Sequence, residues 1–186
     1  AAFPVVAHIA NVRPMKGHAD ALRAAAVVAR HWPKTVFLFA GRDDSGGAYA
    51  RLAGELGVGA MARWLGYHPR PREILRAADL AILPSHYEGC PAALLEAMAE
   101  RRPIAASRAG GIPELVRHER EALLVEPRRP EALAEAIGRL ARDRALRERL
   151  AAAARARAEA EFSLERMVRR YEERYAWLAR EAGRPR

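Results

Sequence analysis

Residues 80–99 read LAILPSHYEGCPAALLEAMA, an apolar run, a short polar break and a longer apolar segment. The run at 80–84 lacks polar alternation, as expected of a strand buried on both faces of a parallel sheet. Pro91 suits the first turn of a helix, where its missing N–H leaves no hydrogen bond unmade. The stretch therefore predicts a strand, a loop and a helix over 91–100, which is part of a βαβ unit.

The same pattern extends through the first two thirds of the chain. Further apolar runs predict strands, and helical segments lie between them. The predicted strands are 4–10, 35–41, 61–66, 103–107 and 122–126, and the predicted helices are 18–31, 46–56, 70–77 and 112–117. This alternation is typical of an α/β fold with right-handed crossovers. We therefore predict a doubly wound parallel sheet of about six strands.

The last third of the chain has a different character. Residues 130–161 are rich in Ala, Arg, Glu and Leu, which favour helix throughout. A further helix is expected from Ser163, because apolar residues recur at helical spacing between 164 and 178. The chain is thus expected to carry extra C-terminal helices, with a sheet-bearing unit at 1–161 and a separate helix within 162–186.

Charge and composition narrow the class of protein. The 186 residues carry a formal net charge of +9, and Lys16 and Lys34 are the only lysines. Such a surface attracts phosphates, but the arginines are spread along the chain, which favours compositional bias over a dedicated polyanion surface. One cysteine, no signal-peptide pattern and no apolar run of about 20 residues predict a cytoplasmic protein, with peripheral membrane attachment as an alternative.

Two carboxylates, Glu88 and Glu96, flank the break at Gly89 to Pro91. Ligands of doubly wound sheets bind beyond the carboxyl ends of strands, which is where this loop falls. The start of the helix can hold an anion, Gly89 lets the backbone approach it, and each carboxylate can accept two hydroxyl hydrogen bonds. The arrangement suits a ligand with hydroxyls at both ends and phosphate in the middle. Taken alone, this spacing more often belongs to two ordinary surface carboxylates.

Other predicted loops are less specific. Arg13 and Lys16 precede a helix, which fits a diphosphate site and a solvated loop equally well. Gly110 and Gly111 can bring backbone amides to a ligand, although we favour a tight strand-to-helix turn. The six histidines have no metal-ligand spacing, so no metal site is expected.

The ordered set of motifs resembles the group 1 retaining glycosyltransferases, also called glycosyltransferase family 4. SHYEGCPAALLEAMAERRPIAAS (85–107) is similar to the family signature E-G-[FC]-P-x-x-L-L-E-A-M-A. The resemblance covers about residues 4–175. The other family blocks, in the same order, are NVRPMKGH (11–18), RWLGYHPRPREILRAADLAILPS (63–85), AGGIPELV (109–116) and EALLVEPRRPEALAEAIGRL (121–140).

The resemblance implies a GT-B fold of two Rossmann-like halves, of which this sequence looks like the C-terminal half that binds the nucleotide-sugar donor. It implies sugar transfer from a nucleotide diphosphate sugar to an acceptor, with retention and without a metal or other cofactor. The N-terminal acceptor half would be missing, so the fragment alone is expected to be inactive. In the family the helix at 163–180 crosses to that half. Without it we expect the apolar stripe of this helix to be exposed, frayed or buried by a second copy.

Residue roles follow from the same resemblance. Glu88, the expected catalytic residue, lies by the donor sugar, and Glu96 bonds the ribose hydroxyls. Lys16 neutralises the diphosphate. The family arginine that grips the diphosphate is Asn11 here, and Arg13 is the candidate to replace it. Further donor contacts are expected from the loop residues Gly89, Cys90, Pro91 and Ala92, and from the base-binding turn at Tyr67, His68 and Arg70.

Two other function classes stay open. A basic module would bind nucleic acid or an anionic membrane with a steep salt dependence. A nucleotide-sugar epimerase of related fold, which shares the Glu pair, would interconvert a free nucleotide sugar without an acceptor. The Lys-Gly pair at 16–17 and the block at 88–91 favour the glycosyltransferase, so we expect a nucleotide sugar and no nucleic acid as partner.

Overall fold

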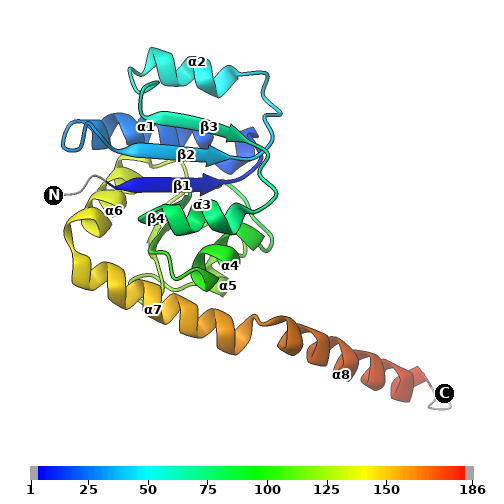
Figure 1. Cartoon of the computed structure of the whole chain (residues 1–186). Coiled ribbons are helices and arrows are strands. Elements are labelled where there is room, and N and C mark those ends of the chain that lie inside the picture. Colours follow the sequence, from blue (N-terminus) through cyan, green and yellow to red (C-terminus); the bar gives the residue numbers. More distant parts are fainter. Residues whose placement is uncertain (1–3, 183–186) are drawn as a thin grey trace.

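Six parallel strands form one sheet in the order β3-β2-β1-β4-β5-β6, as the computed structural model shows (Figure 1). The order reverses between β1 and β4, and the crevice at such a point is where doubly wound sheets bind ligands. The structure describes residues 4–182, so the ends of the two predicted units, 1–3 and 183–186, lie outside the described residues. The strands are β1 (Val5–Ile9), β2 (Val36–Ala40), β3 (Ala62–Gly66), β4 (Leu80–Leu83), β5 (Ile104–Ser107) and β6 (Leu123–Val125).

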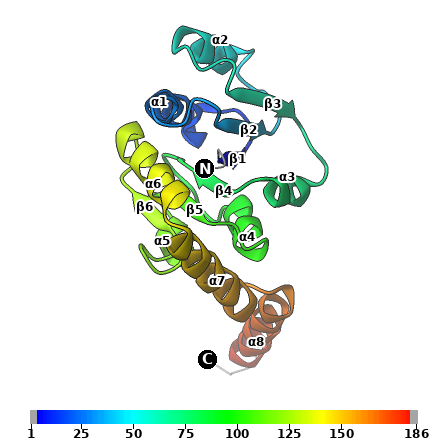
Figure 2. The same ribbon diagram turned by 60° about the vertical axis from the view of Figure 1, so that its left-hand side comes forward.

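Helices cover both faces of this sheet. Figure 2 shows α1 and α6 on one face and α3 and α4 on the other, and a buried apolar cluster lies under each set. Strands β4 and β5 are buried on both faces, which explains their continuous apolar runs, whereas the edge strand β3 is largely exposed. The helices are α1 (His18–Ala29), α2 (Ala48–Glu55), α3 (Pro71–Ala77), α4 (Ala92–Ala99), α5 (Ile112–Leu115), α6 (Pro130–Arg142), α7 (Arg144–Glu161) and α8 (Leu164–Ala182), with the short 3₁₀ helix η1 (Pro14–Lys16) before α1.

The structure confirms the predicted doubly wound α/β fold and refines its C-terminal part. Each predicted strand and helix of the first two thirds is present, with ends that differ by no more than two residues. The helical region at 130–161 is two helices, since Asp143 ends α6 and caps α7 by accepting a hydrogen bond from the N–H of Leu146 at 2.8 Å. The sequence pattern did not reveal this break.

Helix α8 follows α7 and runs away from the sheet (Figure 1). Its apolar stripe is exposed, which is one of the arrangements expected for this helix. No helix among residues 4–182 is long and apolar enough to cross a membrane. The exposed stripe consists of Leu164, Met167, Val168, Tyr171, Tyr175 and Leu178, beside the exposed Trp177.

Helix α4 ends in a turn that glycine would favour. Arg101 has a φ of +53°, and its N–H bonds the carbonyl of Met98 while the N–H of Arg102 bonds that of Ala97. These two bonds form a Schellman motif, whose left-handed residue is usually Gly. Because Arg101 is exposed and carries a Cβ, this position stores backbone strain.

Replacing Arg101 by Gly is therefore expected to raise the free energy of unfolding by about 0.5–1 kcal/mol. Relief of about 1–2 kcal/mol of left-handed strain outweighs the freedom that Gly adds to the unfolded chain. Urea unfolding measures the change. Arg101→Ala is the matched control, because it removes the same side chain and keeps the strain. Equal stabilities of the two variants would contradict the explanation.

Two histidines are buried in the core beside the first loop. The rings of His8 on β1 and His18 at the start of α1 are 4.4 Å apart, and His18 also packs against the rings of Phe39, Tyr49 and Trp64. Burial lowers the pKa of His8 to about 4 and that of His18 to about 2. Both imidazoles are therefore neutral at physiological pH.

Stability should fall as the pH falls from about 6.5 towards 4, because the unfolded histidines take up protons before the folded ones do. Each histidine contributes a slope of up to about 1.4 kcal/mol per pH unit in this window. His18→Phe keeps an aromatic ring and should roughly halve the slope in urea unfolding. The exposed His31, changed to Gln, serves as control. An unchanged slope in His18→Phe would refute the assignment.

Candidate functional site

A pocket of about 500 Å³ opens at the carboxyl ends of β1, β2 and β4. Its walls come from the loop after β1, the turn after β3, the loop after β4 and the first half of α4. Elements distant in sequence meet here because the strand order reverses between β1 and β4. The lining residues are Ile9, Ala10, Asn11, Arg13, Lys16, Ala40, Gly41, Tyr67, His68, Pro71, Leu83, Glu88, Pro91, Ala92, Ala93 and Glu96.

Nine of the twelve predicted donor residues line this pocket, and three lie elsewhere. Arg70 precedes α3, is exposed and pairs with Glu73 at 3.0 Å. Gly89 is exposed in the loop itself. The exposed Cys90 lines a different cavity, on the side that meets the start of α8, together with Phe162, Met167 and Tyr171. A donor contact through Cys90 stays a prediction.

The centre of the site is an ion pair between the loops after β1 and β4. Lys16 Nζ donates hydrogen bonds to both carboxylate oxygens of Glu88, at 2.7 and 2.9 Å. The hydroxyl of Ser85 donates a third bond to Glu88 Oε1, at 2.7 Å. Glu88 is 7% exposed, and a carboxylate so buried depends on such partners. The sequence indicated both charged residues as site residues but did not indicate their contact.

Glycines let the neighbouring loops pack against this pair. Gly17 has a φ of +70°, and a Cβ there would lie 2.0 Å from the carbonyl oxygen of Pro84. A Cβ on Gly111 would lie 1.9 Å from the carbonyl oxygen of Gly89, and its N–H bonds the carbonyl of Glu88 at 2.9 Å. The turn interpretation of the glycine pair is thus confirmed, since Gly111 directly precedes α5. These contacts also bring the loop after β5 against the site.

Further polar contacts hold the loop after β4, and the sequence did not indicate them. His86 pairs with the buried Asp20 of α1 at 2.6 Å, and its N–H bonds the carbonyl of Met15 at 2.8 Å. Ser107 donates a hydrogen bond to the carbonyl of Ser85. These paired residues are too far apart in sequence for any spacing rule to connect them. Only knowledge of the strand order would have suggested that they meet.

The loop after β2 positions the remaining cation of the pocket. Arg13 Nε donates to Asp44 at 2.6 Å, and this bond is the main cause that lowers the pKa of Asp44. Asn11 accepts a hydrogen bond from the N–H of Arg42 at 3.0 Å. Both residues line the pocket: Arg13 is half exposed there, and Asn11 also joins the two loops.

Helix α4 supplies the opposite wall. Its N-cap is Pro91, no side chain caps it, and the next two residues line the pocket, so its first N–H groups are available to an anion. Glu96 follows further along the helix. Burial raises the pKa of the Glu96 carboxyl, and the positive charge of Arg72 partly offsets the rise.

Across residues 4–182 no three His, Cys, Asp or Glu side chains converge in a way that could hold a metal ion. The site therefore offers cations, helix N–H groups and two carboxylates to a ligand. This chemistry suits a bound phosphate next to a polyhydroxylated group.

Comparison with known proteins identifies the family. Residues 2–157 match the family model described as glycosyl transferases group 1. The D-inositol 3-phosphate glycosyltransferase of Corynebacterium jeikeium is 34% identical over 154 residues, which cover 77% of this chain and 36% of that protein. The alpha-D-kanosaminyltransferase of Streptomyces kanamyceticus is 29% identical over 163 residues, covering 87% of this chain and 42% of its own length.

Solved structures share the fold. Anabaena HepE in complex with UDP superposes with a TM-score of 0.87 and 25% identity, over 94% of this chain and 49% of that one. Sucrose-phosphate synthase from Thermosynechococcus elongatus gives a TM-score of 0.86 and 29% identity, over 96% and 46% of the two chains. The chain thus spans less than half the length of these relatives. With the family model matched over most of its length, the chain belongs to the group 1 glycosyltransferases.

Proposed function

We propose that this chain is the nucleotide-sugar donor-binding domain of a retaining glycosyltransferase. The observation that carries the proposal is the pocket in which Lys16, Glu88, Glu96 and the start of α4 meet. In this proposal residues 1–161 bind the donor, and the helix within 162–186 packs on the acceptor-binding part of the whole enzyme. Because the relatives are more than twice as long, transfer to an acceptor is proposed for the whole enzyme only.

The pocket suggests an order for the parts of the donor. The turn at Tyr67 and His68 would meet the base, and Glu96 would accept the hydrogen bonds of the ribose hydroxyls. The first N–H groups of α4 and the ammonium group of Lys16 would hold the diphosphate. The sugar would then lie beside Glu88. Uridine is the base to test first, because HepE is in complex with UDP and with UDP-glucose.

The proposed chemistry depends on charge at the leaving group. Departure of the diphosphate leaves negative charge on its oxygens while positive charge develops on the sugar. Lys16, Arg13 and the start of α4 would stabilise the diphosphate, and we propose that no metal is needed. Glu88 would stand next to the developing positive charge. Fixed groups of this kind each typically contribute about 10²–10³-fold in rate.

The family match and the pocket favour a transferase over the two alternative classes. A nucleic-acid or membrane-binding module would not need two carboxylates in its binding pocket. An epimerase belongs to another functional class than the curated relatives, which are named as glycosyltransferases.

The two carboxylates should have separable effects on donor binding. Glu96→Gln should weaken UDP and UDP-glucose alike, by about tenfold or more, because a hydrogen bond to a charged group contributes about 1.5–3 kcal/mol. Glu88→Gln should weaken UDP binding less than Glu96→Gln does, although it loosens the pair with Lys16, and should reduce the advantage of UDP-glucose over UDP. Isothermal titration calorimetry measures both ligands, with the exposed Glu126→Gln as control. Negligible effects of both changes would remove the pair from the site.

Lys16 should dominate the affinity for the diphosphate. Lys16→Met is expected to lower UDP affinity at least about tenfold, because a charge-assisted bond to the phosphates is lost. The dependence of affinity on salt should also become shallower. The matched control is Lys34→Met, at the other lysine of the chain, which does not line the pocket. Equal UDP affinities of the two lysine variants would argue against a diphosphate at Lys16.

A further inference from the structure

We propose that Glu100 and Arg72 are positioning residues for the nucleoside. They join α3 to α4 and thereby set the distance between the turn that would meet the base and the carboxylate that would meet the ribose. This inference rests on the proposed function, because it concerns the geometry of the same pocket. Neither residue lines the pocket, so neither would touch the ligand.

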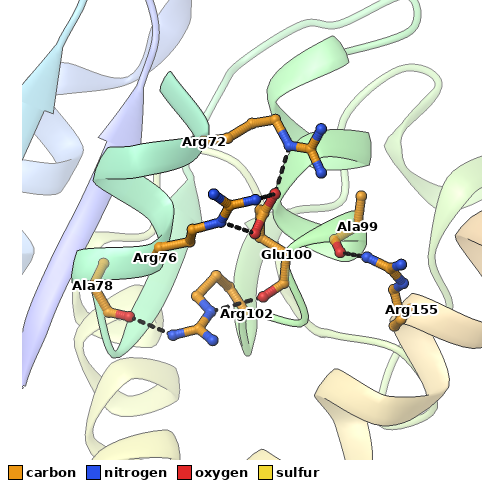
Figure 3. Close-up of polar contacts among 7 residues, drawn as sticks. All are labelled: Arg72, Arg76, Ala78, Ala99, Glu100, Arg102 and Arg155. Atoms are coloured by element: carbon orange, nitrogen blue, oxygen red, sulfur yellow. Dashed lines mark hydrogen bonds and ion pairs between the residues drawn. The ribbon is translucent and has the colours of Figure 1, made fainter. Parts of the chain in front are cut away.

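The contacts converge on a single carboxylate at the end of α4 (Figure 3). Arg72 Nε donates to Glu100 Oε1 at 2.5 Å, and Arg76 Nε donates to Glu100 Oε2 at 2.7 Å. A second nitrogen of Arg76 reaches Oε1 at 3.2 Å. The two arginines lie four residues apart and thus share one face of α3. One acidic side chain of α4 therefore holds two successive positions of α3.

A third arginine joins the same two helices through their backbones. Arg102 donates from Nε to the carbonyl of Glu100 and from Nη1 to the carbonyl of Ala78, both at 2.9 Å (Figure 3). Ala78 follows the last residue of α3 and Glu100 follows the last residue of α4. The carboxyl-terminal ends of both helices are therefore fixed to each other.

This cluster differs from an ordinary surface ion pair. Isolated exposed pairs contribute little, whereas networks with good geometry contribute more. The side chain of Glu100 is only 8% exposed although it lies at a helix end, and its hydrogen bond with Arg76 is the leading cause that lowers its pKa. A carboxylate so covered has few alternative positions. Glu100 therefore joins α3 to α4 through several directed hydrogen bonds to one well-covered carboxylate.

Both helices lead directly into the pocket. Helix α3 begins at Pro71, which lines the pocket and follows the turn of Tyr67 and His68. Helix α4 carries Glu96, which lies one turn before Glu100 on the same face. A shift of α3 along α4 would therefore change the distance between the turn and Glu96. The start of α4 and Lys16, which would hold the diphosphate, do not depend on α3.

Arg72 also acts on Glu96 itself. The two side chains line one groove between α3, α4 and α7, and the charge of Arg72 favours the ionised form of Glu96. Arg72 bonds Glu100 through Nε, and its two Nη groups have no hydrogen-bond partner within residues 4–182. Glu100 thus holds a cation beside the carboxylate that would accept the ribose hydroxyls.

The test compares UDP with inorganic pyrophosphate as calorimetric ligands. Glu100→Gln should lower the affinity for UDP at least about fivefold and change the affinity for pyrophosphate by no more than about twofold. The reason is that only the nucleoside would contact groups positioned by both α3 and α4. Arg72→Gln, at a side chain 55% exposed, should act in the same direction without threatening the fold. Glu159→Gln is the matched control, because Glu159 pairs with Arg155 in the same groove but does not join α3 to α4.

A general loss of structure would lower the affinities for UDP and for pyrophosphate by the same factor, and that result would overturn the inference. UDP binding within twofold of the unchanged chain in both variants would also overturn it. If the unchanged chain bound neither UDP nor pyrophosphate, the proposed function itself would fall, and the inference with it. Binding of UDP by the unchanged chain separates these outcomes, because it supports the function whatever the variants do.

Discussion

The site depends on one part-buried ion pair, that of Lys16 with Glu88. It joins the loops after β1 and β4 at the one place in the sheet where adjacent strands send their connections in opposite directions. Without a cation nearby, the nearly buried carboxylate of Glu88 would be costly. The loops must therefore approach closely, and Gly17 allows this approach, while Gly111 lets the loop after β5 pack against the loop after β4. The pocket is the space that remains beside this contact.

The fold was largely predictable because its signals are local. A strand buried on both faces must be apolar at every position, and β4 and β5 are buried throughout. Proline at the first turn of a helix is a similarly local signal, and it marks the starts of α3 and α6. Such rules need no knowledge of what lies across the sheet. The break at Asp143 was missed, because one acidic residue within a helix-favouring segment is not a distinctive signal.

The candidate site was predictable in its members but not in its contacts. The sequence motifs identified Lys16 and Glu88 as site residues. The two are 72 positions apart, and only the folded sheet brings them into contact. The same holds for the pair of Asp20 with His86. Cys90 shows the opposite case, since it lies next to pocket residues in sequence while its side chain lines another cavity. Neighbours in sequence can point their side chains into different cavities where the backbone turns into a helix.

The separation of α8 from the sheet also has a mechanical consequence. Its 19 residues span about 28 Å at the usual rise of an α-helix. It is joined to α7 only through Phe162 and Ser163. At that length, a rotation of about 10° at the junction would displace the far end by about 5 Å. A small angular change at this junction, which lies beside Cys90, would therefore move the far part of the exposed apolar stripe by a large distance.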